Sequence, residues 1–195
     1  DQDSGIEIID VGAVFNILDT SGGLIKTSDT SNSEYALCVT EGTVNMYGGT
    51  ISESYVGVLV DEEGTFNMYS GAISQNGQRD MYYSGGGVRT KGTFNMYGGI
   101  ISDNKGNDGS GVSIPGGIFR MYGGTITANT SEYDGYGVIV YSTFYLYGGS
   151  IVGNTNEAGQ ADVNVYAGNF VRSGGEIGTL SCEDAIHKWS NRIVF

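Results

Sequence analysis

A phrase of 14 residues that recurs along the chain is the feature that most constrains its fold. The clearest copy is KGTFNMYGGIISDN at residues 91–104. Close copies stand at residues 41–54, 63–76, 116–129 and 141–154, and more divergent copies at residues 15–25 and 169–177. The first apolar residues of successive copies lie 22 to 29 positions apart. A period in this range predicts a solenoid or another array of stacked repeats.

The repeated phrase alternates in the manner of a β-strand. In the clearest copy Phe94 and Met96 are apolar, whereas the residues after each of them are polar or amphipathic. This period of two indicates a strand with one buried side. A Gly-Gly pair then permits a sharp bend, and Ile101 lies in a second short strand. A third alternating segment, such as residues 57–60, separates the copies, so each repeat predicts three short strands.

Three strands and three corners in about 25 residues predict one turn of a right-handed, three-faced parallel β-helix. Each strand then pairs with its equivalents about 4.8 Å above and below, and like residues stack in rows. The chain holds about seven such coils. A β-propeller needs about 40 to 50 residues per blade, and leucine-rich repeats need a Leu-x-Leu pattern that is absent here. The predicted core consists of a Phe row (Phe66, Phe94, Phe119, Phe144, Phe170), a Met row (Met46, Met68, Met96, Met121, Leu146) and an Ile row (Ile51, Ile73, Ile101, Ile126, Ile151, Ile177).

The phrase G-T-F-x-M-x-G-G-x-I-x-x-N resembles the right-handed β-helix repeats of large bacterial surface and adhesin-like proteins, which have a pectate-lyase-like fold. It is more loosely similar to the GG-x-I and F-x-x-N repeats of chlamydial polymorphic outer-membrane proteins. The resemblance covers most of residues 11–180. It implies the fold, but the same coil carries adhesins, polysaccharide lyases and glycosidases, so function depends on the site.

The sequence predicts one all-β domain over residues 1–195. Residues 1–36 hold a divergent coil and a polar loop, residues 37–180 the regular coils, and residues 181–195 a short C-terminal cap. The cap begins with a pattern typical of a helix N-terminus and ends in a strand at residues 192–195. Arg172 takes the place that methionine holds in earlier coils, which predicts that the stack ends nearby.

The charge balance excludes several partners. With 22 acidic and 9 basic residues the net charge is −13, which argues against nucleic acid and against an anionic membrane surface. No apolar run approaches the roughly 20 residues that span a bilayer, so membrane insertion is not expected. The first residues show no signal-peptide pattern, as expected if a signal has been removed or if the chain is an excised piece. The acidic, Thr-, Ser-, Asn- and Tyr-rich composition favours an extracellular or cell-surface location.

The sequence predicts neither a metal site nor a cofactor. Cys38 and Cys182 lie in distant coils, roughly 25 Å apart at the spacing of stacked strands, and are expected to be free thiols. His187 has no second ligand of the kind that zinc requires. The acidic, glycine-rich residues 105–111 match neither the EF-hand nor the nonapeptide calcium pattern.

Loops of varying length follow the Asn that closes each phrase, at residues 77–86, 105–110, 130–136 and 155–161. Since all leave from one corner, they should gather on one edge, and such insertions often mark the binding face of a solenoid. Aromatic rings beside carboxylates suit a sugar, although these could equally be ordinary solvated loops. The predicted ligand-binding residues are Arg79, Tyr82, Tyr83, Tyr133, Asp134 and Tyr136.

These features favour a non-catalytic surface or adhesin-type binding module that contacts carbohydrate or a cell-surface glycan. The first alternative is a glycosidase or polysaccharide lyase, because two carboxylates about 5 Å or 6.5 to 9.5 Å apart can cleave a glycosidic bond. Its candidate catalytic residues are Asp80, Asp108, Glu132 and Asp134. The second alternative is a filament subunit. In that case the open edge at residues 6–9 would accept residues 192–195 of a neighbour and give end-to-end homo-association.

An outward row of tyrosines is a second candidate surface. Such a strip could be a contact surface. The structural interpretation is favoured, because tyrosine prefers strands and packs well across them. The row comprises Tyr47, Tyr69, Tyr97, Tyr122 and Tyr147, flanked by Asn45, Asn67, Asn95, Arg120 and Tyr145.

Overall fold

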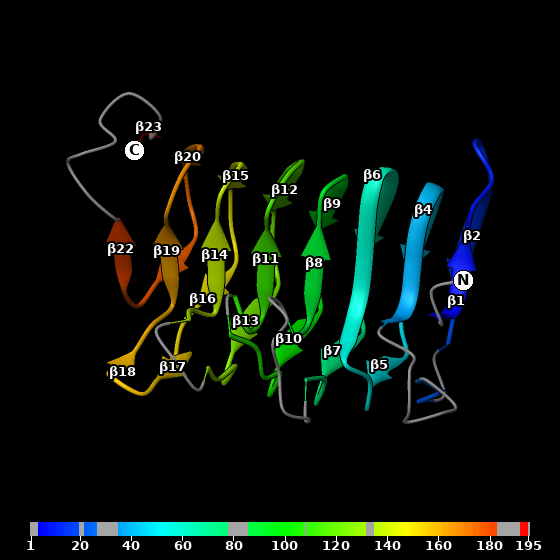
Figure 1. The fold of residues 1–195 in the computed structure, drawn as a ribbon, viewed down its shortest axis with the longest axis horizontal. Coiled ribbons are helices and arrows are strands. Elements are labelled where there is room, and N and C mark those ends of the chain that lie inside the picture. The colour runs from blue at the N-terminus through cyan, green and yellow to red at the C-terminus, as the bar shows by residue number, and fades with distance from the viewer. Residues whose placement is uncertain are drawn as a thin grey trace.

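The chain folds as a right-handed parallel β-solenoid. The computed structural model describes residues 4–19, 22–26, 35–77, 86–107, 109–131, 135–182 and 192–194, and within these all regular structure is strand. In Figure 1 the near strands run upward, the far strands run downward, and the stack advances from right to left. This winding is right-handed. Each regular coil has three strands and three corners, as the repeat predicted.

The first face of the solenoid is the near row in Figure 1. Its strands pair in parallel in the order β1 (Ser4–Ile8), β4 (Tyr35–Met46), β6 (Val56–Met68), β8 (Val88–Thr90), β11 (Val112–Ile114), β14 (Val138–Val140), β19 (Val163–Val165) and β22 (Leu180–Cys182). Strands β4 and β6 are long enough to continue around the first corner onto the second face, which joins these two faces into one 14-stranded sheet.

The second face carries the Phe and Met rows, and the third carries the Ile row. The second face continues from β4 and β6 with β2 (Val14–Ile17), β9 (Thr93–Met96), β12 (Ile118–Met121), β15 (Thr143–Leu146), β20 (Asn169–Arg172) and β23 (Arg192–Val194). The third face has seven strands: β3 (Leu24–Ile25), β5 (Thr50–Ser52), β7 (Ala72–Ser74), β10 (Ile100–Ser102), β13 (Thr125–Thr127), β16 (Ser150–Ile151) and β21 (Glu176–Ile177). Seven stacked third-face strands correspond to the seven predicted coils.

Like residues stack on like residues in the core. Phe94 pairs with Phe66 in the preceding coil and with Phe119 in the following one, with ring centroids 5.4 and 4.7 Å away. Met96 lies fully buried between the Met68 and Met121 strands. The predicted register is therefore confirmed, and every member of the three rows is buried except Ile177, which is partly buried.

The Gly-Gly corner between the second and third faces leaves no room for side chains. At Gly98 a Cβ atom would lie 2.5 Å from the carbonyl oxygen of Tyr69 in the coil before. At Gly99 a Cβ would lie 2.6 Å from the Met68 Cε atom, and the backbone has a φ of +86°, which favours glycine. These glycines therefore allow the coils to stack closely around the methionine row.

A buried asparagine ladder forms the third corner. The Asn104 side-chain nitrogen donates to Asn129 Oδ1 at 2.9 Å and to the carbonyl of Ile73. Asn129 Oδ1 also accepts from the backbone nitrogen of Asn104, and the pattern repeats along the ladder. Its members are fully buried, and the bonds satisfy polar groups that would otherwise destabilise the core. They are Asn76, Asn104, Asn129 and Asn154.

The two ends of the stack differ. In the first coil Phe15 is 38 % exposed, whereas the later members of its row are fully buried. At the other end β23 pairs in parallel with β20 of the same chain, which confirms the predicted terminal strand. Ser181 and Cys182 extend the first face as part of β22, and residues 183–191 and 195 of the predicted cap lie outside the described part of the chain. Arg172 is partly buried and donates to the carbonyls of Gly174 and Gly175.

Candidate functional site

The residue just before the last position of each repeated phrase has an unusual backbone conformation. Glu53, Gln75, Asp103 and Ala128 have φ angles between 54° and 58°, in the left-handed region. Gly153 holds the same place one coil later. In this conformation the side chain projects outward from the corner, and all four side chains are exposed. The corner therefore carries one outward side chain per coil, in a row parallel to the solenoid axis.

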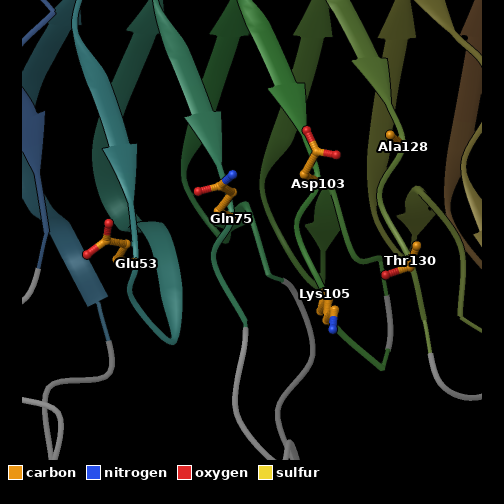
Figure 2. A pocket seen from close by; sticks show the side chains of 6 residues that line it. All are labelled: Glu53, Gln75, Asp103, Lys105, Ala128 and Thr130. Carbon is orange, nitrogen blue, oxygen red and sulfur yellow. The ribbon is translucent and has the colours of Figure 1, made fainter.

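This row lines a groove with a volume of about 500 Å³. Figure 2 shows the row crossing the ends of successive strands, with Lys105 and Thr130 below it. Lys105 and Thr130 follow ladder asparagines and pair with each other in a parallel bridge. The groove spans four consecutive coils, because each of these coils contributes one residue of the outward row. It is lined by Glu53, Gln75, Asp103, Lys105, Ala128 and Thr130.

The groove is polar and open to solvent. Glu53 forms an ion pair with Lys26 at 2.6 Å, with both side chains about half exposed. Such an exposed pair is worth only about 0 to 1 kcal/mol, so it can rearrange around a ligand. Asp103 adds an acceptor, Lys105 a donor and Gln75 both. The set suits a ligand rich in hydroxyl groups, because a hydroxyl both donates and accepts hydrogen bonds.

The groove lies at the root of the loops that the sequence singled out. Of the predicted ligand-binding and catalytic residues only Tyr136 lies in the described part, and Arg79, Asp80, Tyr82, Tyr83, Asp108, Glu132, Tyr133 and Asp134 lie outside it. The Tyr136 side chain is half-buried, and its carbonyl accepts from the Ser110 backbone nitrogen at 2.7 Å.

The described parts of these loops stack against one another. Ser131 bonds to the Thr155 carbonyl through its backbone nitrogen and to the Asn107 carbonyl through its hydroxyl. The Asn156 amide donates to the Gly135 carbonyl. The last loop also contains a short antiparallel hairpin, β17 (Thr155–Asn156) with β18 (Gly159–Gln160). The loops therefore leave from one edge, as predicted.

The sequence interpretation missed four groove residues, Glu53, Gln75, Asp103 and Ala128. They occupy the variable next-to-last position of the repeated phrase, directly after Ser or Thr. That variability was the available signal, because a residue that changes while its neighbours repeat faces away from the core. The left-handed backbone that directs it outward is not encoded by residue type here, since Glu, Gln and Ala do not favour it.

The rings of the outward tyrosine row stack face to face along the solenoid. Adjacent rings have centroids 4.7 to 4.9 Å apart and planes within 19° of parallel. Each inner ring therefore covers its neighbours' faces and presents its edge and hydroxyl to solvent, with 39 to 43 % exposure. Because a sugar stacks on the face of an aromatic ring, the inner tyrosines do not form a sugar platform. We call Tyr47, Tyr69, Tyr97, Tyr122 and Tyr147 the tyrosine strip.

A second amide ladder runs beside the strip on the outer side of the second face. Asn45 donates to Asn16, Asn67 to Asn45 and Asn95 to Asn67 at 2.8 to 3.0 Å. Arg120 continues this row, and its guanidinium lies 5.8 Å from the centre of the Tyr145 ring. The predicted flanking row is therefore present, and hydrogen bonds between side-chain amides join its asparagines.

The cysteines and acidic side chains of the described residues form no further site. Cys38 is buried and Cys182 exposed, and the two are free thiols, as predicted. No group of three or more His, Cys, Asp or Glu side chains suited to a metal occurs within the described ranges. The same part of the chain contains no helix long and apolar enough to cross a membrane. No protein-family model, curated protein or solved structure matches this chain.

Proposed function

We propose that this protein is a non-catalytic extracellular binding module of the surface-adhesin type that binds a linear carbohydrate in the groove of its third corner. The observation that carries the proposal is the groove itself. It runs parallel to the solenoid axis and receives polar side chains from four consecutive coils. Three coil spacings of about 4.8 Å give a row about 14 Å long, which suits an extended oligosaccharide segment. Its volume of about 500 Å³ is within the usual range for ligand sites.

Charge narrows the ligand class. The chain carries a net charge of −13, and the groove contains the carboxylates Glu53 and Asp103. A polyanionic glycan would be repelled, so the proposed ligand is a neutral or amine-bearing glycan. The resemblance of the repeat to bacterial surface proteins supports the proposed location. The loops rooted at Lys105 and Thr130 would add contacts along the same edge.

Glycan-array screening of the whole chain, followed by calorimetry with the best oligosaccharide, tests the proposal. The informative variants are Gln75→Gly and Asp103→Gly, because Gly153 already occupies the equivalent position of a later coil. Glycine fits the left-handed backbone, so the fold is retained while the groove side chains are removed. We expect each variant to weaken binding about tenfold, which corresponds to about 1.4 kcal/mol.

The matched control is Glu62→Gln, which removes an exposed carboxylate on a different corner and should leave affinity unchanged. Equal affinity of the groove variants and the native chain would place the site elsewhere. Failure of the native chain to bind any neutral or amine-bearing glycan would overturn the proposed function. Release of shorter saccharides during the assay would favour the enzyme alternative instead.

A further inference from the structure

The tyrosine strip places five phenols side by side, an arrangement that favours oxidative coupling between neighbouring rings. The strand pairing fixes the spacing of the backbone that carries the rings, since the backbone nitrogen of Tyr97 donates to the Met68 carbonyl and that of Tyr122 to the Met96 carbonyl, both at 2.8 Å. The neighbouring phenols are thus held 4.7 to 4.9 Å apart between ring centres. Their edges and hydroxyls are exposed, so an oxidant can reach them and water can accept their protons.

Phenols that lose one electron and the hydroxyl proton become phenoxyl radicals, whose unpaired electron is shared with the ring carbons beside the oxygen. Two such radicals couple when those carbons meet. In solution this meeting depends on diffusion, whereas in the strip every inner ring already has two neighbours. Since the tyrosines are about 40 % exposed, rotation of their side chains can bring the carbons together without unfolding a strand.

We propose that the tyrosine strip is an oxidative modification site, at which a peroxide-dependent one-electron oxidant joins tyrosines of adjacent coils into dityrosine. Two phenols each give up one electron and one proton, and one hydrogen peroxide takes up both electrons and both protons to form two waters. The two radicals form a carbon–carbon bond between the positions beside their oxygens. The hydrogen on each coupled carbon then moves to the oxygen as a proton, which restores both phenols.

The expected consequence is a covalent link between consecutive coils. Each link ties residues about 25 positions apart, such as Tyr97 and Tyr122, and so restricts the unfolded chain as a disulfide does. The site is independent of the carbohydrate groove, because the strip lies on the second face beside the Gly-Gly corner and the groove at the third corner.

Two double variants with equal numbers of tyrosine test the proposal. Tyr69→Phe with Tyr122→Phe leaves three strip tyrosines, none next to another, whereas Tyr47→Phe with Tyr147→Phe leaves three in an unbroken run. Phenylalanine preserves the stack, which circular dichroism verifies. The whole chain is treated at low concentration with a haem peroxidase and hydrogen peroxide, and dityrosine is measured by fluorescence and located by tandem mass spectrometry of proteolytic peptides.

We expect the variant with the unbroken run to retain intramolecular dityrosine within the strip and the interrupted variant to lose at least nine-tenths of it. Tyr141 and Tyr166, whose rings are 5.0 Å apart but tilted by 50°, provide an internal comparison and should couple less. Equal strip dityrosine in both variants would overturn the proposal. So would cross-links found mainly outside the strip, or mainly between separate chains.

Discussion

Thr90 is a polar residue among the apolar side chains of the core. It lies in β8 with its side chain among the inward residues of the first face, opposite Val60. The residue is fully buried, and its hydroxyl has no hydrogen-bond partner among the described residues. A buried hydroxyl without a partner destabilises the folded state, because it loses its bonds to water and gains none in return.

Thr90→Val should therefore raise the free energy of unfolding, by about 1 kcal/mol. Valine has nearly the same shape and strand preference as threonine, so the change isolates the hydroxyl group. Urea denaturation measures the effect. Thr65→Val, at a half-buried outward position of the second face, is the control and should change stability little. A loss of stability in Thr90→Val would show that the hydroxyl is satisfied in solution.

Asp162 ends the buried asparagine ladder with a carboxylate. Its Oδ1 accepts from the backbone and side-chain nitrogens of Asn154, in the place where another asparagine oxygen would stand. Its Oδ2 accepts from Gln160 and from the backbone nitrogen and hydroxyl of Thr179. The side chain is fully buried, so every surrounding donor requires an acceptor.

Asp162→Asn should destabilise the protein by about 2 to 3 kcal/mol. Whichever way the new amide is oriented, its NH2 group faces donors that the carboxylate accepted from. The thermal unfolding midpoint checks this. The same substitution at Asp103, which is exposed in the groove, should have almost no effect on stability. Equal effects at the two positions would mean that the ladder does not depend on a terminal anion.

At the scale of the element, the tyrosine strip should make stability depend on alkaline pH. The pKa of Tyr97 is raised above its ordinary value of 10.0, first by desolvation and then by Tyr69 and Tyr122 on either side. The folded chain therefore holds this proton more tightly than the unfolded chain does. Between the unfolded and the folded pKa, the unfolded state loses its proton first, so folding stability falls as pH rises.

We expect the free energy of unfolding to be steady below pH 10 and to decline above it, in the window set by the raised pKa of Tyr97. Urea titrations at several alkaline pH values measure the slope. Tyr97→Phe should make the slope shallower, because it removes the central phenol. Tyr141→Phe, away from the strip, is the control. If the slope for Tyr97→Phe were identical to that of the native chain, Tyr97 would not be the source of the pH dependence.

The strands and core rows could be predicted from the sequence because their signals are periodic. Phe94, Met96 and Ile101 recur at fixed offsets in each copy, and parallel stacking converts that recurrence into buried rows. Asp162 could not be predicted in the same way. It joins the ladder only eight positions after Asn154, whereas the regular step is 25 residues or more. It fits there because the next coil supplies no asparagine.

The groove was only partly predictable. The variable loops identified the corner at which the groove lies, since insertions leave a solenoid where its backbone faces solvent. The outward direction of the groove side chains depends instead on a left-handed backbone at positions such as Gln75 and Asp103. Residue preference alone would have placed these residues in ordinary strand or turn conformations. The stacking of the outward tyrosines was predictable, because parallel register places Tyr69 on Tyr97 and covers their faces.

At the scale of the whole molecule, stability should depend on each coil's contacts with its two neighbours. In a solenoid nearly all packing is between adjacent repeats, so a central defect affects both sides and a terminal defect affects one. Phe94 stacks on Phe66 and Phe119, in the middle of the row. Phe170 stacks on Phe144 and lies in the last full coil.

Phe94→Ala should therefore destabilise the entire solenoid, by about 3 to 5 kcal/mol, and raise amide hydrogen exchange in coils on both sides. Phe170→Ala deletes the same side chain from an equally buried site, yet the last coil can open while the others remain folded. The increase in amide hydrogen exchange should be confined to residues after about 160. The free energy of the main unfolding transition should fall less than it does in Phe94→Ala. Hydrogen-exchange mass spectrometry of both variants distinguishes these patterns. If Phe170→Ala raised exchange as strongly near Met46 as near Val165, the coils would unfold as one unit.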